Sequence, residues 1–171
     1  MEKRIIETGG EFPSKDQLAG LGDLAFVFVR APSYQGVTVS ALRAALEPAI
    51  DTGHFAVLRQ DHIPRAFISW AYLDEEAEAR FLNGARLTTQ DWISGDSLWL
   101  MDVVAPYGQG SAARMIKAFH AAIPETIDQY NTVRRAREPG KARRYVMTRL
   151  ANGRWGSRMT GLIDADNSIQ S

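Results

Sequence analysis

One carboxylate in the sequence stands where an acidic side chain is costly. Asp102 lies inside the apolar run 98–104 (Leu-Trp-Leu-Met-Asp-Val-Val), which has the composition of a central β-strand. An unpaired charge inside such a strand would lose its hydration. We therefore expect Asp102 either to pair with a base or hydrogen-bond donor, or to line a pocket at the strand end and take part in acid–base chemistry. A structural carboxylate, paired or at a sheet edge, is the alternative.

A turn with two glycines follows this strand. Gly108-Gln109-Gly110 leads into a predicted helix that Pro124 ends. Glycines before a helix N-terminus leave backbone N–H groups uncovered, which suits a phosphate or pyrophosphate group. An ordinary tight connection between strand and helix is the alternative. The candidate cofactor-binding residues are Gly108, Gly110, Ser111 and Arg114.

Composition and charge restrict the class of protein. The chain has 171 residues, 45% of them apolar, with 20 basic and 20 acidic side chains. These values predict one domain over 1–171. Within it, we expect the end segments 1–13 and 162–171 to be flexible. The lack of cysteine excludes thiol nucleophiles and Cys-ligated metals and fits the cytoplasm. The longest apolar stretch near the start is only six residues, so we expect neither a membrane span nor a secretory signal.

Hydrophobic periodicity predicts the elements that position these side chains. We expect helices over 14–30, from Thr38 to a limit at Pro48, over 74–82 and from Gly110, and strands over 55–59, 65–70, 98–104, 132–137 and 144–150. The first two strands flank Asp61-His62-Ile63-Pro64 as a hairpin. The fold class is therefore α+β, one domain with a mixed, mostly antiparallel sheet and flanking helices.

Five short motifs at defined spacings carry a family resemblance. They are Asp61-x-x-Pro64, Ser69-Trp70-Ala71, Phe81-Leu82-Asn83, Asp91-Trp92-x-Ser94-Gly95-Asp96-x-x-Trp99 and Asp102-x-x-Ala105-Pro106-Tyr107-Gly108. Together they resemble the toxin-activating lysine acyltransferases of the hemolysin-activating type, which move a fatty acyl chain from acyl carrier protein to lysines of RTX protoxins. The strand, Pro-containing bend, G-x-G and helix also resemble the acyl-donor segment of Gcn5-related N-acyltransferases, whose fold holds a pantetheine arm between splayed strands.

The resemblance implies roles for two residues. The family's catalytic aspartate falls on Asp102, and its catalytic histidine, in a Ser-Pro-x-His segment, falls on Tyr34 in Ala31-Pro32-Ser33-Tyr34. An ordinary tyrosine, with a pKa of about 10, is a better proton donor than acceptor. We therefore expect Tyr34 to protonate the leaving thiol and Asp102 to orient or activate the lysine amine. His62 is the best substitute base among the three histidines, and the expected chemistry needs no metal.

Donor and partners follow from the same resemblance. The expected donor is an acyl carrier protein thioester carried on phosphopantetheine, with acyl-CoA as the alternative, and the acceptor is a lysine of an RTX-type protoxin. Acyl carrier protein is acidic, and a basic C-terminal face would complement it: Arg134, Arg135, Arg137, Arg143 and Arg144. Aromatic residues there are too sparse for a nucleic-acid partner. A Gcn5-type acyl-CoA N-acyltransferase, a non-catalytic binding protein and a homodimer are left open.

Overall fold

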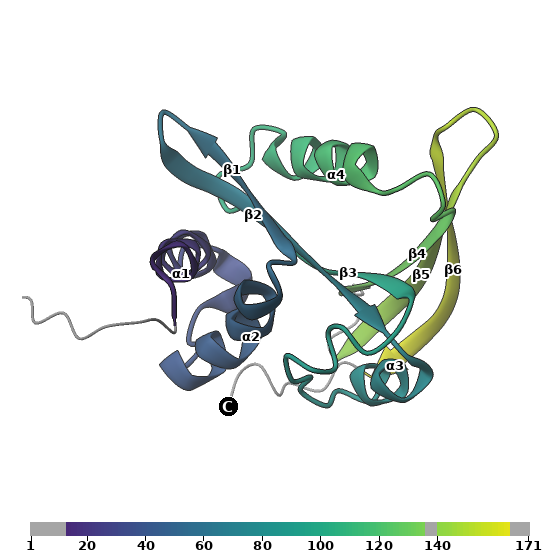
Figure 1. The fold of residues 1–171 in the computed structure, drawn as a ribbon, viewed down its shortest axis with the longest axis horizontal. Helices are drawn as coiled ribbons and strands as arrows, with labels where there is room; N and C mark the ends of the chain where they lie inside the picture. Colours follow the sequence, from purple (N-terminus) through teal and green to yellow (C-terminus); the bar gives the residue numbers. More distant parts are fainter. Residues whose placement is uncertain (1–12, 136–139, 165–171) are drawn as a thin grey trace, which may run out of the picture.

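The strands form one sheet in chain order. The computed structural model describes residues 13–135 and 140–164 (Figure 1). The strands are β1 (Phe55–Gln60), β2 (Ile63–Leu73), β3 (Ser97–Val104), β4 (Gln129–Arg135), β5 (Lys141–Arg149) and β6 (Trp155–Asp164). The sheet order is β1-β2-β3-β4-β5-β6, and each pair is antiparallel except β3–β4, which is parallel. The predicted α+β class with a mostly antiparallel sheet is confirmed.

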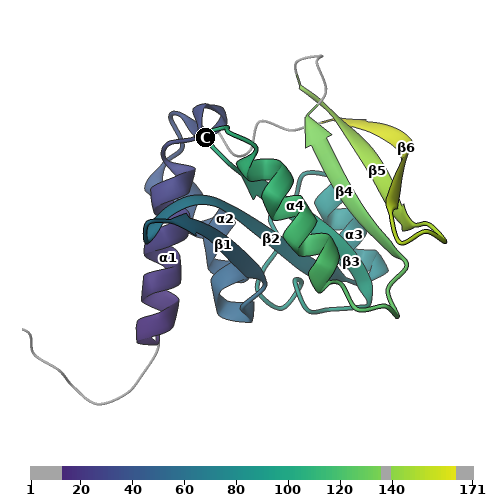
Figure 2. The ribbon, with the colours of Figure 1, turned by 90° about the horizontal axis from the view of Figure 1, so that it is seen from above.

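Helices cover both faces of this sheet. They are α1 (Lys15–Phe28), the short 3₁₀ helix η1 (Pro32–Tyr34), α2 (Val39–Thr52), α3 (Glu75–Leu82) and α4 (Ser111–Ala122). Figure 1 shows α1 and α2 on one face and α4 on the opposite face. Seen from above, α4 lies across the β2–β3 part of the sheet, with β4, β5 and β6 to one side (Figure 2). No helix within 13–135 and 140–164 is long and apolar enough to cross a membrane.

Two helices end at other residues than predicted. Ser14 and Gln17 form a capping box at the start of α1, and the helix ends at Phe28 rather than Arg30. The prediction that Pro48 limits α2 is wrong, because the helix continues to Thr52. Proline removes one backbone donor at that turn. Its own carbonyl stays satisfied by the Thr52 hydroxyl at 2.7 Å, and Gly53 in the left-handed region ends the helix.

The β1–β2 hairpin is confirmed, with a tighter turn than expected. Asp61 and His62 both have positive φ (50° and 63°), as a two-residue turn of the I′ type requires. Pro64 therefore lies within β2 instead of the turn. It pairs with Arg59 beside a register shift in β1, where a residue without an N–H is tolerated.

Three clusters of buried side chains make up the core. One lies between the sheet and α4 and includes Leu100 and Phe119. A second packs α1 and α2 against Phe67 and Val104 of the sheet. The third joins α3 to the sheet around Trp92 and Trp99, which are 4% and 0% exposed.

The end of the described chain departs from the expected boundary. We expected a flexible segment from residue 162, but β6 continues through Asp164 and pairs Leu162 and Ile163 with β5. Cross-strand hydrogen bonds hold these residues in the sheet. The last residue of β4 is Arg135, so residues 136 and 137 of the predicted strand 132–137 lie outside the described ranges. The segments 1–12 and 165–171 also lie outside them.

Candidate active site

Asp102 lies on β3 beside an irregularity in the sheet. It pairs with Ser69 of β2, and the next β2 residue, Trp70, pairs with Leu100, so that Met101 bulges out of the ladder. A bulge turns the side chains around it, and such bulges are common next to active sites. Ser69 is 2% exposed and Asp102 is half-buried, so the carboxylate sits at the edge of the core.

Tyr34, which lies 68 positions before Asp102 in the sequence, contacts its carboxylate. The Tyr34 hydroxyl donates a hydrogen bond to Oδ1 of Asp102 at 3.0 Å. Its ring stacks on Phe28 at the end of α1, with centroids 4.0 Å apart and planes at 29°. The turn of η1 fixes this position, because the Tyr34 N–H donates to the Ala31 carbonyl. The two predicted catalytic side chains are therefore in direct contact.

The parallel strands β3 and β4 separate close to this pair. Among the residues that the structure describes, they are paired only at Trp99–Asn131 and Leu100–Thr132. Beyond these pairs β3 follows β2 to Val104, while β4 follows β5. Asp102 lies on the part of β3 that is no longer paired with β4, close to the point where two strands of one sheet separate.

The glycine turn after β3 has an unusual backbone. Gly108, Gln109 and Gly110 have φ of 64°, 52° and 74°, three left-handed residues in a row. Gly110 is the N-cap of α4 and no side chain caps this helix end. A Cβ at Gly108 or Gly110 would have nothing within 4 Å, so the space beside the turn is open. Ser111 is buried and Arg114 is exposed one turn further along.

The W-x-S-G-D motif holds the loop before β3 in place. The Ser94 hydroxyl donates to the Asp91 carbonyl and accepts from the Asp74 N–H, joining this loop to the start of α3. Hydrogen bonds from Thr88, together with a salt bridge to Arg80, hold the pKa of the Asp91 carboxyl below its ordinary value. A Cβ on Gly95 would lie 2.5 Å from the Asp74 nitrogen, so only glycine fits there.

A sequence profile of the RTX toxin acyltransferase family (HlyC) matches residues 14–148. The chain belongs to this family. It is 37% identical over 93 residues to the RTX-I toxin-activating lysine-acyltransferase ApxIC of Actinobacillus pleuropneumoniae, covering 54% of each chain. The protein-lysine myristoyltransferase HlyC of Escherichia coli is 34% identical over 93 residues, 54% of this chain and 55% of that one.

Longer but weaker similarity extends to other proteins. The protein-lysine palmitoyltransferase CyaC of Bordetella bronchiseptica is 26% identical over 131 residues, 76% of this chain and 71% of CyaC. The chain spans about half the length of ApxIC and HlyC. Among solved structures, the loading GNATL domain of CurA from Lyngbya majuscula aligns with TM-score 0.48 and 17% identity, covering 70% of this chain and 62% of that one.

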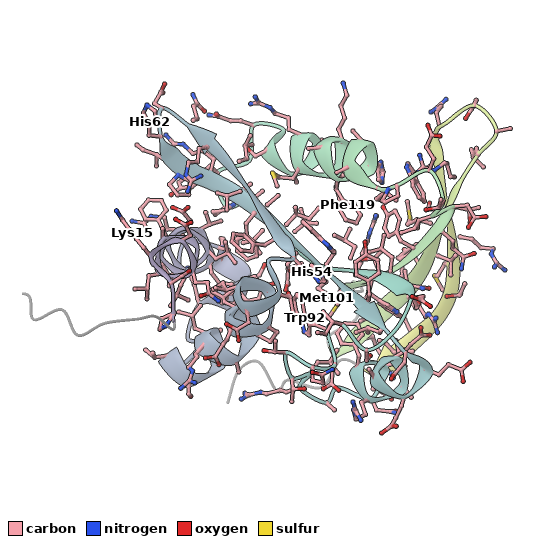
Figure 3. The ribbon with its side chains drawn as sticks, viewed as in Figure 1. Lys15, His54, His62, Trp92, Met101 and Phe119 are labelled. Carbon is pink, nitrogen blue, oxygen red and sulfur yellow. The ribbon has the colours of Figure 1, made fainter. Side chains whose placement is uncertain are left out.

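The three histidines lie elsewhere than the contact between Tyr34 and Asp102. His62 is at the hairpin tip, far from the β3 bulge at Met101 (Figure 3). The His54 ring lies against Trp70, which packs in the α4 cluster, whereas Tyr34 packs against the α1–α2 cluster. His120 on α4 hydrogen-bonds the Tyr130 hydroxyl at 2.8 Å.

Burial changes the pKa of His54, His120 and Tyr130. It lowers the pKa of His54, whose buried Nδ1 has no hydrogen-bond partner. It also lowers the pKa of His120, with a further contribution from the positive charge of Arg149. Burial raises the pKa of Tyr130 to about 12. All three groups are therefore held in their neutral forms near pH 7.

The predicted basic face is only partly a free surface. Arg144 forms a salt bridge with Glu78 and lies over the Trp99 ring, with Cζ 5.2 Å from the centroid. The Nε of Arg143 is also buried, while Arg134 is exposed. The side chains of Arg135 and Arg137 lie outside the described residues. The sequence did not predict the salt bridge of Glu78. This residue lies in an acidic helix, and the sequence does not show which of its acidic side chains points toward the sheet.

Proposed function

We propose that the chain is a protein-lysine acyltransferase that moves a fatty acyl group from a thioester donor to a lysine side chain of an RTX-type protoxin in the cytoplasm. The observation that carries the proposal is the hydrogen bond from the Tyr34 hydroxyl to Asp102, close to the point where β3 and β4 separate. Membership in the RTX toxin acyltransferase family supports the reaction class. The names of ApxIC and HlyC support a lysine acceptor.

The Tyr34–Asp102 pair can move the protons of this reaction without a histidine. The lysine nitrogen attacks the thioester carbonyl, a C–N bond forms, and the C–S bond then breaks. The proton that the nitrogen sheds goes to the Asp102 carboxylate, and the Tyr34 phenol gives its proton to the departing thiolate. The hydrogen bond between them then returns the proton from Asp102 to the Tyr34 oxygen, so that the products are an amide and a thiol and the pair is restored.

The donor arm would lie where β3 and β4 separate. A pantetheine arm carries amide groups, which suit two strands that are no longer paired to each other. The uncapped start of α4, with Gly108, Gly110, Ser111 and Arg114, would take the phosphate of the arm, because backbone N–H groups and the helix dipole favour an anion there. Acyl carrier protein is the proposed source of this arm, with acyl-CoA as the alternative.

The experiment offers the chain both donors. Purified protein is incubated with an RTX protoxin fragment and either palmitoyl-acyl carrier protein or palmitoyl-CoA, and modified lysines are identified by mass spectrometry. We expect lysine acylation from the carrier protein, faster than from acyl-CoA and slowed by salt, because charge complementarity acts mainly on association. Acylation from CoA alone would assign the other donor. No acylation from either donor would contradict the proposed function.

A further inference from the structure

We propose that Glu78 and Arg144 are positioning residues for acyl transfer, because they close a ring of hydrogen bonds at the point where β3 and β4 separate. This inference rests on the proposed function. Glu78 Oε2 accepts from the Ser97 hydroxyl (3.4 Å), which accepts from Nδ2 of Asn131 (3.3 Å). Nη2 of Arg144 donates to Oδ1 of Asn131 (3.3 Å) and to Oε1 of Glu78 (2.5 Å).

The ring joins four elements across the strand junction. Its members come from α3, β3, β4 and β5 in turn. Asn131 pairs with Trp99, and this is one of the two residue pairs that join β3 and β4 in the described ranges. Nε1 of Trp99 also donates to Glu78, at 3.1 Å. The side chains therefore reinforce a junction for which the backbone ladder alone provides little support.

The ring is partly shielded from water, so its hydrogen bonds depend strongly on the positions of the side chains that form them. The side chains of Arg144 and Glu78 are 27% and 22% exposed, Asn131 is 6% exposed, and the Arg144 guanidinium lies over Trp99. Both bonds come from one nitrogen, Nη2, whose two N–H groups have fixed directions in the guanidinium plane, so Arg144 can reach Glu78 and Asn131 together only in a narrow range of positions of α3 and β4. Lysine keeps the charge but has a shorter side chain and a freely rotating ammonium, so a substitution there tests geometry rather than charge.

The junction is close to the reacting groups. Asp102 follows Trp99 by three positions on β3, about 10 Å of strand. A change of angle at Trp99 and Asn131 therefore changes the separation of the two strands further along, where the donor arm would lie. Misplacement of a bound substrate by about 1 Å can cost as much as 10²-fold in rate. The ring thus sets the fit of the donor rather than the chemistry at Asp102.

Two variants test this inference. Glu78→Gln keeps the shape of the side chain and removes its charge, and Arg144→Lys keeps the charge and removes the planar guanidinium. We expect each to raise the KM for the acyl donor about tenfold, with kcat within a few-fold of wild type. The matched control is Arg43→Gln, which breaks an Arg–Glu pair on the exposed surface of α2, with Arg43 73% exposed, and should leave both constants unchanged.

A second measurement needs no enzymatic activity. Hydrogen exchange of the backbone amides of β3 and β4 should be faster in both ring variants than in Arg43→Gln, and a non-hydrolysable acyl-pantetheine should bind about tenfold more weakly. Faster exchange together with weaker donor binding supports the ring even if wild type transfers no acyl group, so the two proposals fail separately. Donor binding equal to that of the control, or a loss in kcat alone, would overturn the positioning role.

Discussion

The hydroxyl of Tyr34 donates a hydrogen bond to the carboxylate of Asp102 at 3.0 Å, across 68 positions of the chain. Two elements bring about this contact: η1, which turns the chain directly after α1, and the bulge at Met101, which displaces β3 from a regular ladder. The stacking of Tyr34 on Phe28 fixes the ring, so the hydroxyl has a defined direction. A proton donor and a proton acceptor are thereby placed together where β3 leaves β4.

Substitution of Asp102 by asparagine tests the acceptor. The amide keeps the shape of the carboxylate but cannot take a proton from the attacking amine, so acyl transfer should fall by about 10²-fold or more while the thermal midpoint changes little. Mass spectrometry of the acceptor, together with thermal melts, measures both. Asp96→Asn, an exposed aspartate of the W-x-S-G-D motif, serves as the control. Normal transfer by folded Asp102→Asn protein would remove this carboxylate from the mechanism.

A pair of glycine substitutions tests whether the W-x-S-G-D motif is structural. Gly95→Ala would place a methyl group 2.5 Å from the backbone nitrogen of Asp74 and should destabilise the protein by about 1–3 kcal/mol. Gly22→Ala, in the exposed surface of α1 with nothing within 4 Å, should stabilise it by about 0.5–1 kcal/mol. Urea denaturation measures both free energies. Equal effects of the two substitutions would show that the loop has room at Gly95.

The stability of the protein should depend on pH through His54. Burial lowers the pKa of His54 in the folded state from its ordinary value of 6.5, so the unfolded state binds more protons at acidic pH. This contribution to stability is therefore complete above about pH 6.5 and is lost as the pH falls below it.

The measurement for His54 is chemical denaturation at several pH values. His54→Phe should reduce the loss of unfolding free energy between about pH 7 and pH 5, since phenylalanine keeps the ring between Trp70 and Tyr72. His62→Asn, at the exposed hairpin turn, should leave the loss unchanged. If His54→Phe lost as much unfolding free energy between these pH values as wild type, the assignment of this pH dependence to His54 would be contradicted.

The sequence predicted the features that depend on local pattern. The α+β class, the hairpin and the strand around Asp102 follow from periodicity and turn residues. The family motifs singled out Asp102 and Tyr34, and the structure shows that these two side chains are in contact. The continuation of α2 through Pro48 was not predictable, since burial of this face offsets the lost backbone bond. Propensity is a weak guide where tertiary packing decides.

Long-range pairing was the other limit. Arg144 belongs to a basic run that suggested a docking surface, but the structure turns it inward toward Glu78, 66 positions away. Whether an arginine faces solvent or a buried acid depends on which strand neighbours its own, and a single sequence does not show that. The Arg144–Glu78–Asn131 contacts therefore became apparent only once the sheet order was known.

The most direct test of the account compares wild type with two substitutions of Tyr34. Acyl transfer to a protoxin lysine is measured for Tyr34→Phe and Tyr34→His, with thermal melts as the control for folding. We expect Tyr34→Phe, which keeps the stacking on Phe28 but has no proton to give, to lower transfer by roughly 10²–10⁴. Tyr34→His should retain or raise activity near neutral pH, because it places an imidazole beside Asp102. Full activity of folded Tyr34→Phe protein would contradict the account.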